Sequence, residues 1–150
     1  LQHIKKAFDI IKKYNIRTTG YTMIGFPTET REEVFQTINF IRELDLDISI
    51  MSIFYPFVGT PLREFCIENG YITGNEKTTN FTDPPILRNQ PMSPMEVYNI
   101  RRLYSLYTRL PVEYFPKIER CEKDFDNNLE LYNDLISLMY KSYYRSWNLS

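Results

Sequence analysis

Two short apolar segments, each followed by a tight turn and a helical pattern, constrain the fold of this chain more than any other feature. Residues 17–26 combine threonine, tyrosine, methionine and isoleucine and end in a Gly-Phe-Pro turn, and residues 48–55 form a second apolar run that stops at a proline. Runs of this kind are typical of buried strands. Amphipathic helical patterns cover residues 1–14, 30–44 and 60–69. The alternation of helices and strands with short connections predicts parallel α/β units.

The starts of the predicted helices carry capping signals. Thr30 and Glu33 have the spacing of a capping box, in which each side chain satisfies a backbone N–H that the helix leaves without a partner. Ser93 and Glu96 have the same spacing. Thr60, like Ser93, is followed by a proline, which is favoured in the first turn because its missing N–H is not needed there. The stripe expected to be buried in the helix after Thr30 consists of Val34, Ile38, Ile41 and Leu44.

The second half of the chain has a different pattern. Residues 73–91 show no sustained period and are predicted to form a long ordered loop. We expect a helix from residue 94 to about residue 110, a short connection over residues 112–121 and a last helix over about residues 125–147. The apolar stripe of the last helix is Leu129, Tyr132, Leu135, Ile136, Met139 and Tyr143. A charged run is predicted to form a solvated face: Glu122, Lys123, Asp124, Asp126 and Glu130.

Two strands with flanking helices do not make a complete sheet. A parallel pair leaves two edges unpaired, and sheets with so few strands are marginal in water. The run over residues 48–55 is apolar on both faces, which suits a central strand with a layer on either side. The first 72 residues are therefore predicted to be units of a larger barrel or doubly wound sheet. Either the missing strands lie upstream of Leu1 in a parent protein, or a second copy of the chain covers the edge.

Composition excludes several classes of partner. With 18 Lys and Arg against 19 Asp and Glu, the net charge of −1 gives no basic face for nucleic acid. No apolar stretch approaches the length of about 20 residues that a membrane span needs. Two cysteines are too few for a disulfide framework, which favours a reducing, cytoplasmic setting. His3 is the only histidine and is expected to be exposed, so a metal site is not predicted, and Cys66 is expected to be a small buried apolar residue.

Two sequence strings carry a resemblance to a known family. Residues 20–30 read GYTMIGFPTET and residues 54–62 read FYPFVGTPL, and each string ends a strand, turns and opens a helix. Together they resemble the later half of a radical S-adenosylmethionine (radical SAM) barrel, and most closely the branch whose members often carry an upstream cobalamin-binding domain. The resemblance covers residues 1–72 well and the tail from residue 73 only in general character. It implies an α/β fold: a partial (β/α) barrel over residues 1–72, then an α-helical extension over residues 73–150.

The chain departs from the family pattern in ways that limit what it can do alone. Thr28 stands where the family usually has glycine, and Phe57 and Val58 replace its usual x-Pro pair. The three-cysteine cluster motif is absent, because Cys66 and Cys121 lie 55 positions apart and cannot supply three thiolates. The resemblance therefore implies the C-terminal part of a cytoplasmic iron–sulfur enzyme. Its 4Fe-4S cluster would lie outside this chain, which would contain no catalytic or metal-binding residue and would be inactive alone.

The resemblance also implies that the two strand ends hold part of a cofactor, since barrels bind their ligands at the C-terminal ends of the strands. The end of the first strand would press apolar side chains and bare backbone against the adenine of S-adenosylmethionine, and the end of the second would offer backbone hydrogen bonds to the adenine edge. In the family, reductive cleavage of the sulfonium gives a 5′-deoxyadenosyl radical that takes hydrogen from substrate, in some members with cobalamin. The implied cofactor-binding residues are Met23, Ile24, Gly25, Phe26, Tyr55, Pro56 and Phe57.

Simpler structural roles compete with these assignments. Met23 and Ile24 also fit ordinary core positions, and alternation along a strand allows only one of them to face inward. Gly25 suits a tight turn whether or not a ligand approaches it. Glu29 is expected to favour the helix N-terminus through the macrodipole. Tyr55 is expected to be a strand-end aromatic residue whose hydroxyl has a partner.

Two other functions remain open at this stage. The chain could be a non-catalytic α/β module that dimerises through its open sheet edge and binds a protein partner with its tyrosine-rich helices. It could also belong to a different α/β barrel enzyme whose phosphate or cofactor site lies at residues 25–30, where helix N–H groups could hold an anion.

Overall fold

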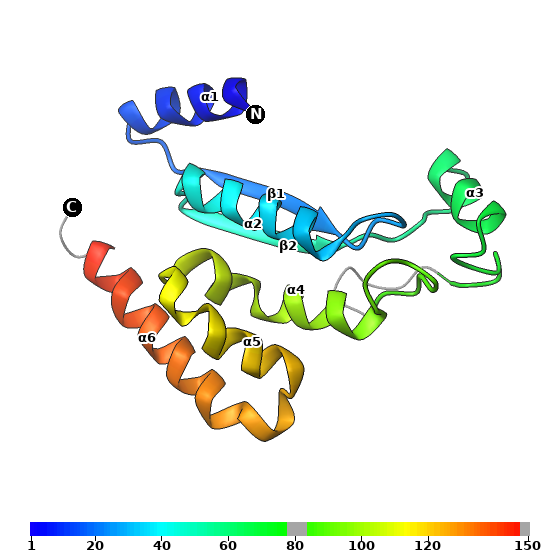
Figure 1. The fold of residues 1–150 in the computed structure, drawn as a ribbon. Coiled ribbons are helices and arrows are strands. Elements are labelled where there is room, and N and C mark those ends of the chain that lie inside the picture. Colours follow the sequence, from blue (N-terminus) through cyan, green and yellow to red (C-terminus); the bar gives the residue numbers. More distant parts are fainter. Residues whose placement is uncertain (78–83, 148–150) are drawn as a thin grey trace.

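The computed structural model describes residues 1–77 and 84–147, with side chains described through residue 142, so the side chain of Tyr143 lies outside the described residues. Figure 1 shows two strands beside a layer of helices, with α3 standing apart at one end. The elements are α1 (Gln2–Lys13), β1 (Thr19–Ile24), α2 (Arg31–Leu44), β2 (Ile48–Ile53), α3 (Pro61–Glu68), α4 (Pro94–Arg109), η1 (Val112–Tyr114), α5 (Phe115–Lys123), η2 (Asp126–Asn128) and α6 (Leu129–Trp147).

The two strands form a parallel pair, as the alternating pattern predicts. Thr19 of β1 lies opposite Ile48 of β2, and the register continues to Ile24 opposite Ile53. The helix α2 connects them, which makes a β-α-β unit. The expected fold class is confirmed: an α/β part with two parallel strands and flanking helices is followed by a helical C-terminal part.

The predicted helix starts are confirmed. Thr30 and Glu33 form a complete capping box at α2, and Thr60 caps α3 by accepting from a backbone N–H. Ser93 caps α4 by accepting from the N–H of Glu96. The Glu96 carboxylate does not complete a box there, because it pairs with Arg31 of α2 instead.

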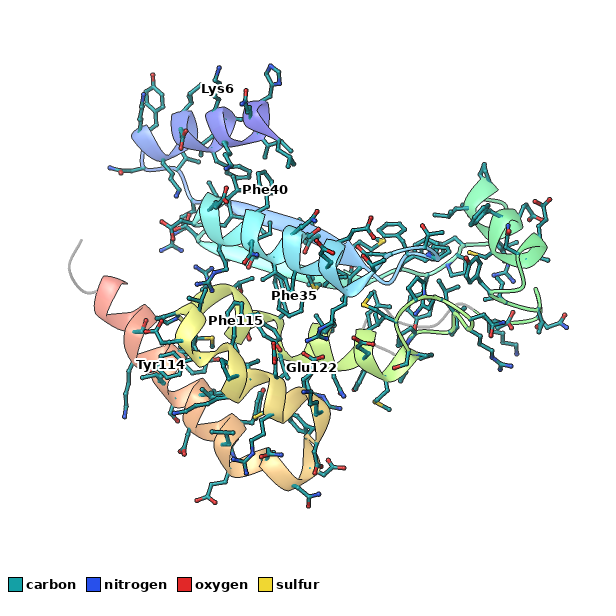
Figure 2. All side chains as sticks on the ribbon, in the orientation of Figure 1. Lys6, Phe35, Phe40, Tyr114, Phe115 and Glu122 are labelled. Atoms are coloured by element: carbon teal, nitrogen blue, oxygen red, sulfur yellow. The ribbon has the colours of Figure 1, made fainter. Side chains whose placement is uncertain are left out.

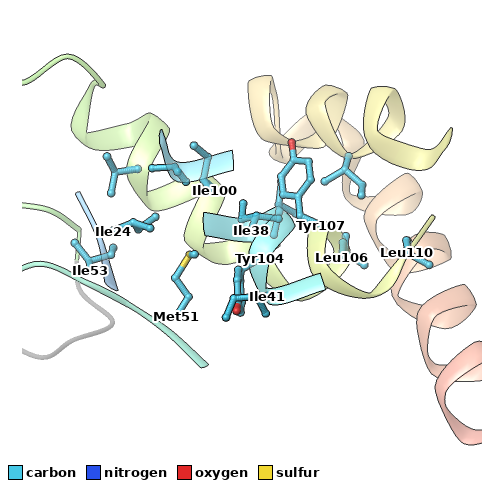
Figure 3. Close-up of a cluster of buried hydrophobic side chains, with 14 of the residues drawn as sticks. Ile24, Ile38, Ile41, Met51, Ile53, Ile100, Tyr104, Leu106, Tyr107 and Leu110 are labelled. Atoms are coloured by element: carbon cyan, nitrogen blue, oxygen red, sulfur yellow. The ribbon is translucent and has the colours of Figure 1, made fainter. Parts of the chain in front are cut away.

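One face of the sheet is buried against helices. Ile24, Met51 and Ile53 point to this face and join the main hydrophobic core. Figure 3 shows them beside Ile38 and Ile41 of α2 and beside Ile100 and Tyr104 of α4. The predicted α2 stripe is confirmed, since all four of its residues are buried. The helices α2 and α4 thus cover the same side of the strands.

The opposite face of the sheet is exposed. Tyr21, Ile48 and Ile50 are 77%, 49% and 43% exposed, and Met23 lies on this face beside them. The sequence predicts that helices or other layers cover both faces of β2. Within residues 1–77 and 84–147, only one face of β2 is covered. In that part of the chain the sheet has two strands, so its outer edges have no strand partner.

The first helix packs on α2 and leaves part of its own apolar stripe uncovered. Ion pairs join Lys5 to Glu43 and Lys12 to Asp45. Figure 2 shows the Phe40 side chain between α1 and α2, whereas Phe35 points from the other side of α2 toward the later helices. The exposed apolar side chains of this helix and its flanks are Leu1, Ile4, Ile10 and Tyr14.

The prediction of a short connection over residues 112–121 is wrong. These residues begin with the single turn η1 and continue into the nine-residue helix α5, which starts at Phe115 with a proline in its first turn. The buried side of α5 carries Ile118, Cys121 and Glu122, the spacing of one helical face. The last helix accordingly begins at Leu129 rather than near residue 125.

The prediction that Glu122 belongs to a solvated face is also wrong. Glu122 is only 7% exposed, and its two carboxylate oxygens lie 2.5 Å and 3.1 Å from the guanidinium nitrogens of Arg31. The hydroxyl of Tyr107 donates to the same carboxylate at 2.6 Å. Burial and this hydrogen bond raise the pKa of Tyr107 above its usual value, and the Glu122 bond raises the pKa of Arg31. The network joins α2, α4 and α5. The negative charge of Glu122 can be buried because the positive charge of Arg31 pairs with it.

Two neighbouring tyrosines of α4 give a matched test of this core. Tyr104→Phe removes a buried hydroxyl that has no hydrogen-bond partner among the described residues, so the free energy of unfolding should stay within about 0.5 kcal/mol or rise. Tyr107→Phe takes a donor from the buried Glu122 carboxylate, so it should lower the free energy of unfolding by about 1–2 kcal/mol. Chemical denaturation of both variants measures the difference. Equal losses would contradict the hydrogen-bond account.

Candidate functional site

The C-terminal ends of the two strands meet in one place. The N–H of Phe54, just after β2, donates to the carbonyl of Ile24 at 2.7 Å. The rings of Phe26 and Phe54 stack with their centroids 4.9 Å apart. The two sequence strings that carry the family resemblance are therefore neighbours in space, at the end of the sheet where parallel α/β proteins bind ligands.

The turn after β1 is held by the carboxylate of Glu29, which lies just before the N-cap of α2. Gly25 has φ +83°, a conformation that favours glycine. One oxygen of Glu29 accepts from the N–H of Gly25 at 2.6 Å and lies 3.4 Å from the N–H of Phe26. Burial raises the pKa of Glu29, although these two N–H groups act in the opposite direction. Glu29 therefore fixes the turn, a role that the macrodipole interpretation did not include.

Packing gives Gly25 a second reason to be glycine. A Cβ on this residue would lie 2.9 Å from a methyl group of Val97 in α4. The turn after β1 thus rests directly on the helix that covers the sheet. Thr28, which replaces the family's usual glycine, is not among the residues with positive φ, so its side chain fits the turn without strain.

The segment after β2 is fixed by three separate contacts. Tyr55 is buried, and its hydroxyl donates to the carbonyl of Pro84 at 2.7 Å, which confirms that this hydroxyl has a partner. The carbonyl of Pro56 accepts from the Arg63 guanidinium at 2.8 Å. The carbonyl of Phe57 accepts from both the N–H and the hydroxyl of Thr60. The backbone of this segment is therefore held in one conformation.

The seven residues that the family resemblance implies fall into two groups. Met23 and Phe57 present exposed side chains, and Met23 lies on the open face of the sheet. Ile24 is fully buried on the helix-covered face, so only its backbone reaches the end of the strand. Gly25, Tyr55 and Pro56 are also buried, and Phe26 is partly buried. Binding of a ligand by these seven residues stays a prediction.

A shallow cleft of about 510 Å³ lies beside the turn after β1. It brings Leu1, at the start of α1, to the same place as Phe26 and Glu29. The full lining is Leu1, Phe26, Thr28, Glu29, Glu33, Gln36, Thr37 and Phe40. The start of α1 therefore shares this cleft with the turn after β1 and with α2.

The described residues do not fit an iron–sulfur cluster. Within residues 1–77 and 84–147, no three His, Cys, Asp or Glu side chains lie together in a way that could hold a metal ion. Cys66 and Cys121 are both fully buried, in α3 and α5, and burial raises the pKa of each thiol. The expectation for Cys66 is confirmed.

Over the same residues, none of the helices combines the length and the apolar character that crossing a bilayer requires.

The sequence analysis missed the turn-holding role of Glu29 and did not single out Arg63. Glu29 holds the turn after β1, and its position four residues after Gly25 was the available signal. Arg63 holds the segment after β2, and a lone arginine in an otherwise ordinary helix start gave no signal at all.

The chain is similar to parts of several curated enzymes. It is 34% identical over 105 residues to an uncharacterized methyltransferase of Pyrococcus horikoshii, which covers 69% of this chain and 23% of that protein. It is 36% identical over 55 residues to a tRNA-2-methylthio-N(6)-dimethylallyladenosine synthase of Buchnera aphidicola, covering 37% of this chain and 12% of that one. A 4-hydroxy-3-methylbut-2-en-1-yl diphosphate synthase (flavodoxin) of Baumannia cicadellinicola is 32% identical over 95 residues, covering 57% and 24%.

These comparisons show which proteins the chain is related to and how much of each protein the similarity covers. No protein-family profile and no solved structure matches it. The chain spans about a quarter or less of the length of these three relatives. It is a distant homologue of radical SAM enzymes over part of their length. The first alignment, at 105 residues, is longer than the 72-residue α/β part, so the similarity reaches into the second half of the chain.

Substitutions at Glu29 test the carboxylate that holds the turn. Glu29→Ala leaves two backbone N–H groups without their acceptor and should lower the free energy of unfolding by about 1–2 kcal/mol. Glu29→Gln keeps a carbonyl oxygen in place, so its free energy of unfolding should fall by less than that of Glu29→Ala. Glu32→Ala, at an exposed position in the first turn of α2, is the control and should change stability by less than about 0.5 kcal/mol. A loss at Glu32 that matched the loss at Glu29 would contradict this role.

The pH dependence of stability should carry the sign of the shifted Glu29 pKa. Because burial raises this pKa above 4.5, folding favours the protonated acid, and that contribution is lost as the pH rises through the raised value. The amide in the variant Glu29→Gln cannot ionise, so the variant should gain stability relative to the natural protein as the pH rises past 4.5. Unfolding free energies at about pH 4 and about pH 7 measure this, and a trend in the reverse direction would refute it.

Proposed function

We propose that this chain is the C-terminal portion of a radical SAM enzyme, in which the ends of β1 and β2 hold the adenine part of S-adenosylmethionine. The observation that carries the proposal is the meeting of the two family-like strings at one end of a parallel sheet. The hydrogen bond between Phe54 and Ile24 and the stacked rings of Phe26 and Phe54 join them. Distant homology to radical SAM enzymes supports the same assignment.

The placement of the helices supports a barrel rather than a doubly wound sheet. In a β/α barrel the helices lie on the outside, whereas a doubly wound sheet has helices on both faces. Here α2 and α4 cover one face, and the other face is apolar and bare. A bare apolar face is costly in water, but it is suited to the interior of a barrel. Tyr21, Met23, Ile48 and Ile50 would therefore point into the barrel.

The proposed partner of this chain is the rest of the parent barrel upstream of Leu1. Leu1 shares a cleft with the turn after β1, whereas Lys12 pairs with Asp45 just after α2, so α1 runs in the same direction as α2, the helix that follows β1. A strand before Leu1 would therefore run parallel to β1 and could pair with its free edge. It would also cover the apolar side chains that α1 leaves exposed, such as Ile4 and Ile10.

Each part of the strand-end site would have a separate task. Met23 and Phe57 would supply apolar contact to a flat aromatic ring, since both side chains are exposed there. The Pro56 carbonyl already accepts a hydrogen bond from Arg63, which fixes its direction, and its second lone pair could accept from a ligand donor. The Phe57 carbonyl already accepts twice, from the N–H and the hydroxyl of Thr60, and would contribute through the orientation of its side chain. When bound, S-adenosylmethionine supplies the radical chemistry together with a cluster held elsewhere in the parent.

The substrate and any use of cobalamin are not carried over from the relatives. One relative is named for a tRNA nucleoside and another for a diphosphate. With a net charge of −1, this chain has no overall attraction to either polyanionic substrate. A cobalamin domain, as in the resembling branch, would lie upstream of Leu1.

A second candidate function rests on the open edges of the sheet. A module that dimerises through the edge of β1 or β2 would pair backbone groups that the two-stranded sheet leaves open. Light scattering of the complete natural protein that contains this chain separates the two functions. We expect no dimer that depends on the sheet edge, because the parent's own strands would cover it. A dimer that a proline at Thr22 of β1 abolishes would favour the second function.

Ligand binding by the complete natural protein tests the first function. It should bind S-adenosylmethionine, and Met23→Asp should weaken binding about tenfold or more because a charge replaces apolar contact with the adenine. Met23→Ala should weaken it less. Val112→Asp, at an exposed apolar position at the far end of α4, is the control and should leave the dissociation constant unchanged. Isothermal titration calorimetry measures all four proteins, and absence of binding by the natural protein would reject the proposal.

A further inference from the structure

We propose that Arg63 is a positioning residue that holds the segment after β2 in its ligand-binding conformation by tying it to the loop after α3. This inference rests on the proposed function, since it concerns the segment that would contact the adenine. Arg63 lies just after the second of the two sequence strings, and the family resemblance gives it no role.

Arg63 is buried although it carries a charge. Its side chain is only 4% exposed, in the first turn of α3. One guanidinium nitrogen donates to the carbonyl of Pro56 at 2.8 Å. The other donates to the carbonyl of Gly74 at 2.7 Å and lies 3.4 Å from the carbonyl of Glu76. A buried charge is costly unless it is hydrogen-bonded, so these carbonyls are what allow Arg63 to be inside.

The loop that receives Arg63 is itself locally fixed. The carboxylate of Glu76 accepts from the N–H and the hydroxyl of Thr73, at 2.9 Å and 2.8 Å, and from the N–H of Gly74 at 2.9 Å. These bonds lower the pKa of Glu76 to about 2, so the turn keeps its acceptor at all ordinary pH values. The Gly74 and Glu76 carbonyls are thus presented to Arg63 in fixed directions.

The position of α3 shows why such a tie is needed. In Figure 1, α3 stands apart from the sheet, and it is α4 that covers β2. The segment from Pro56 through α3 to residue 77 therefore lies beyond the end of the sheet, with a small core of its own around Phe54, Cys66, Ile72 and Leu87. Arg63 joins the first and last parts of this segment, so the carbonyl of Pro56 is oriented by contacts outside the sheet.

The geometry favours arginine over lysine at this position. The planar guanidinium directs N–H groups to two sides at once, which lets one side chain bridge two separate stretches of backbone. A lysine ammonium is a point donor and could keep one side of the bridge but not both. Arg63→Lys is therefore expected to keep one side of this bridge, whereas Arg63→Met removes both sides.

The test compares Arg63 with a second arginine of similar chemistry. Arg42 of α2 also donates to two backbone carbonyls, those of Tyr107 and Leu110, but at the C-terminal end of α4, away from the strand ends. In the complete natural protein, Arg63→Met should weaken S-adenosylmethionine binding about tenfold, Arg63→Lys should weaken it less, and Arg42→Met should leave it unchanged. Calorimetric titration gives the three dissociation constants.

A second measurement reads the segment directly and does not depend on the ligand. The N–H of Thr60 is bonded to the carbonyl of Phe57 in the structure. Hydrogen exchange, followed by mass spectrometry of peptides covering residues 54–62, should be faster in Arg63→Met than in Arg42→Met, while peptides from β1 exchange equally in both.

The outcomes separate this inference from the function it rests on. If the natural protein does not bind S-adenosylmethionine, the proposed function fails, and the exchange result alone decides the role of Arg63. If the natural protein binds but Arg63→Met binds equally well, or exchange over residues 54–62 is unchanged, the positioning role is overturned. Equal weakening by Arg63→Met and Arg42→Met would also overturn it, because the effect would then be general loss of stability.

Discussion

Ile24, Met51 and Ile53 point to one side of the β1–β2 pair, and the packing of this side against α2 and α4 organises the rest of the molecule. Because a strand alternates its side chains, burial of this set leaves Tyr21, Ile48 and Ile50 on the other side, in solvent. The same alternation separates Met23 from Ile24 at the end of β1. The fold of the described residues is therefore one-sided, and a one-sided parallel sheet is the arrangement found in an arc of a β/α barrel.

The helical second half is held to the α/β part by buried polar contacts as well as by apolar packing. Arg31, Glu122 and Tyr107 come from α2, α5 and α4, so their network joins the β-α-β unit to helices far away in the sequence. At the C-terminal ends of the strands, Glu29 and Arg63 hold the two strand-end segments through backbone groups. These charged side chains fix backbone positions, and the apolar core supplies the burial that makes such contacts strong.

Features with local causes could be predicted from the sequence. The helix starts at Thr30, Thr60 and Ser93 depend on residues three positions apart, and the α2 stripe depends on helical spacing. Features with distant causes could not. Glu122 sits in a charged run that is typical of a surface, and its burial is explained by Arg31, 91 positions away, together with the hydroxyl of Tyr107. The helix α5 is nine residues long and has a proline in its first turn, so its pattern was too short to separate from a connection.

At the candidate site, the meeting of the two strings followed from parallel pairing. Glu29 and Arg63, in contrast, act on backbone groups, which any residue type can supply.

The central claim is that the bare face and the free edge of β1 are built to be covered by other strands of the same parent protein. The most direct test is an experimental structure of the complete natural protein that contains this chain. The account predicts a third strand, parallel to β1 and paired with its free edge, and burial of Tyr21, Met23, Ile48 and Ile50 inside a barrel. A structure in which the edge of β1 and these four side chains face solvent would contradict it.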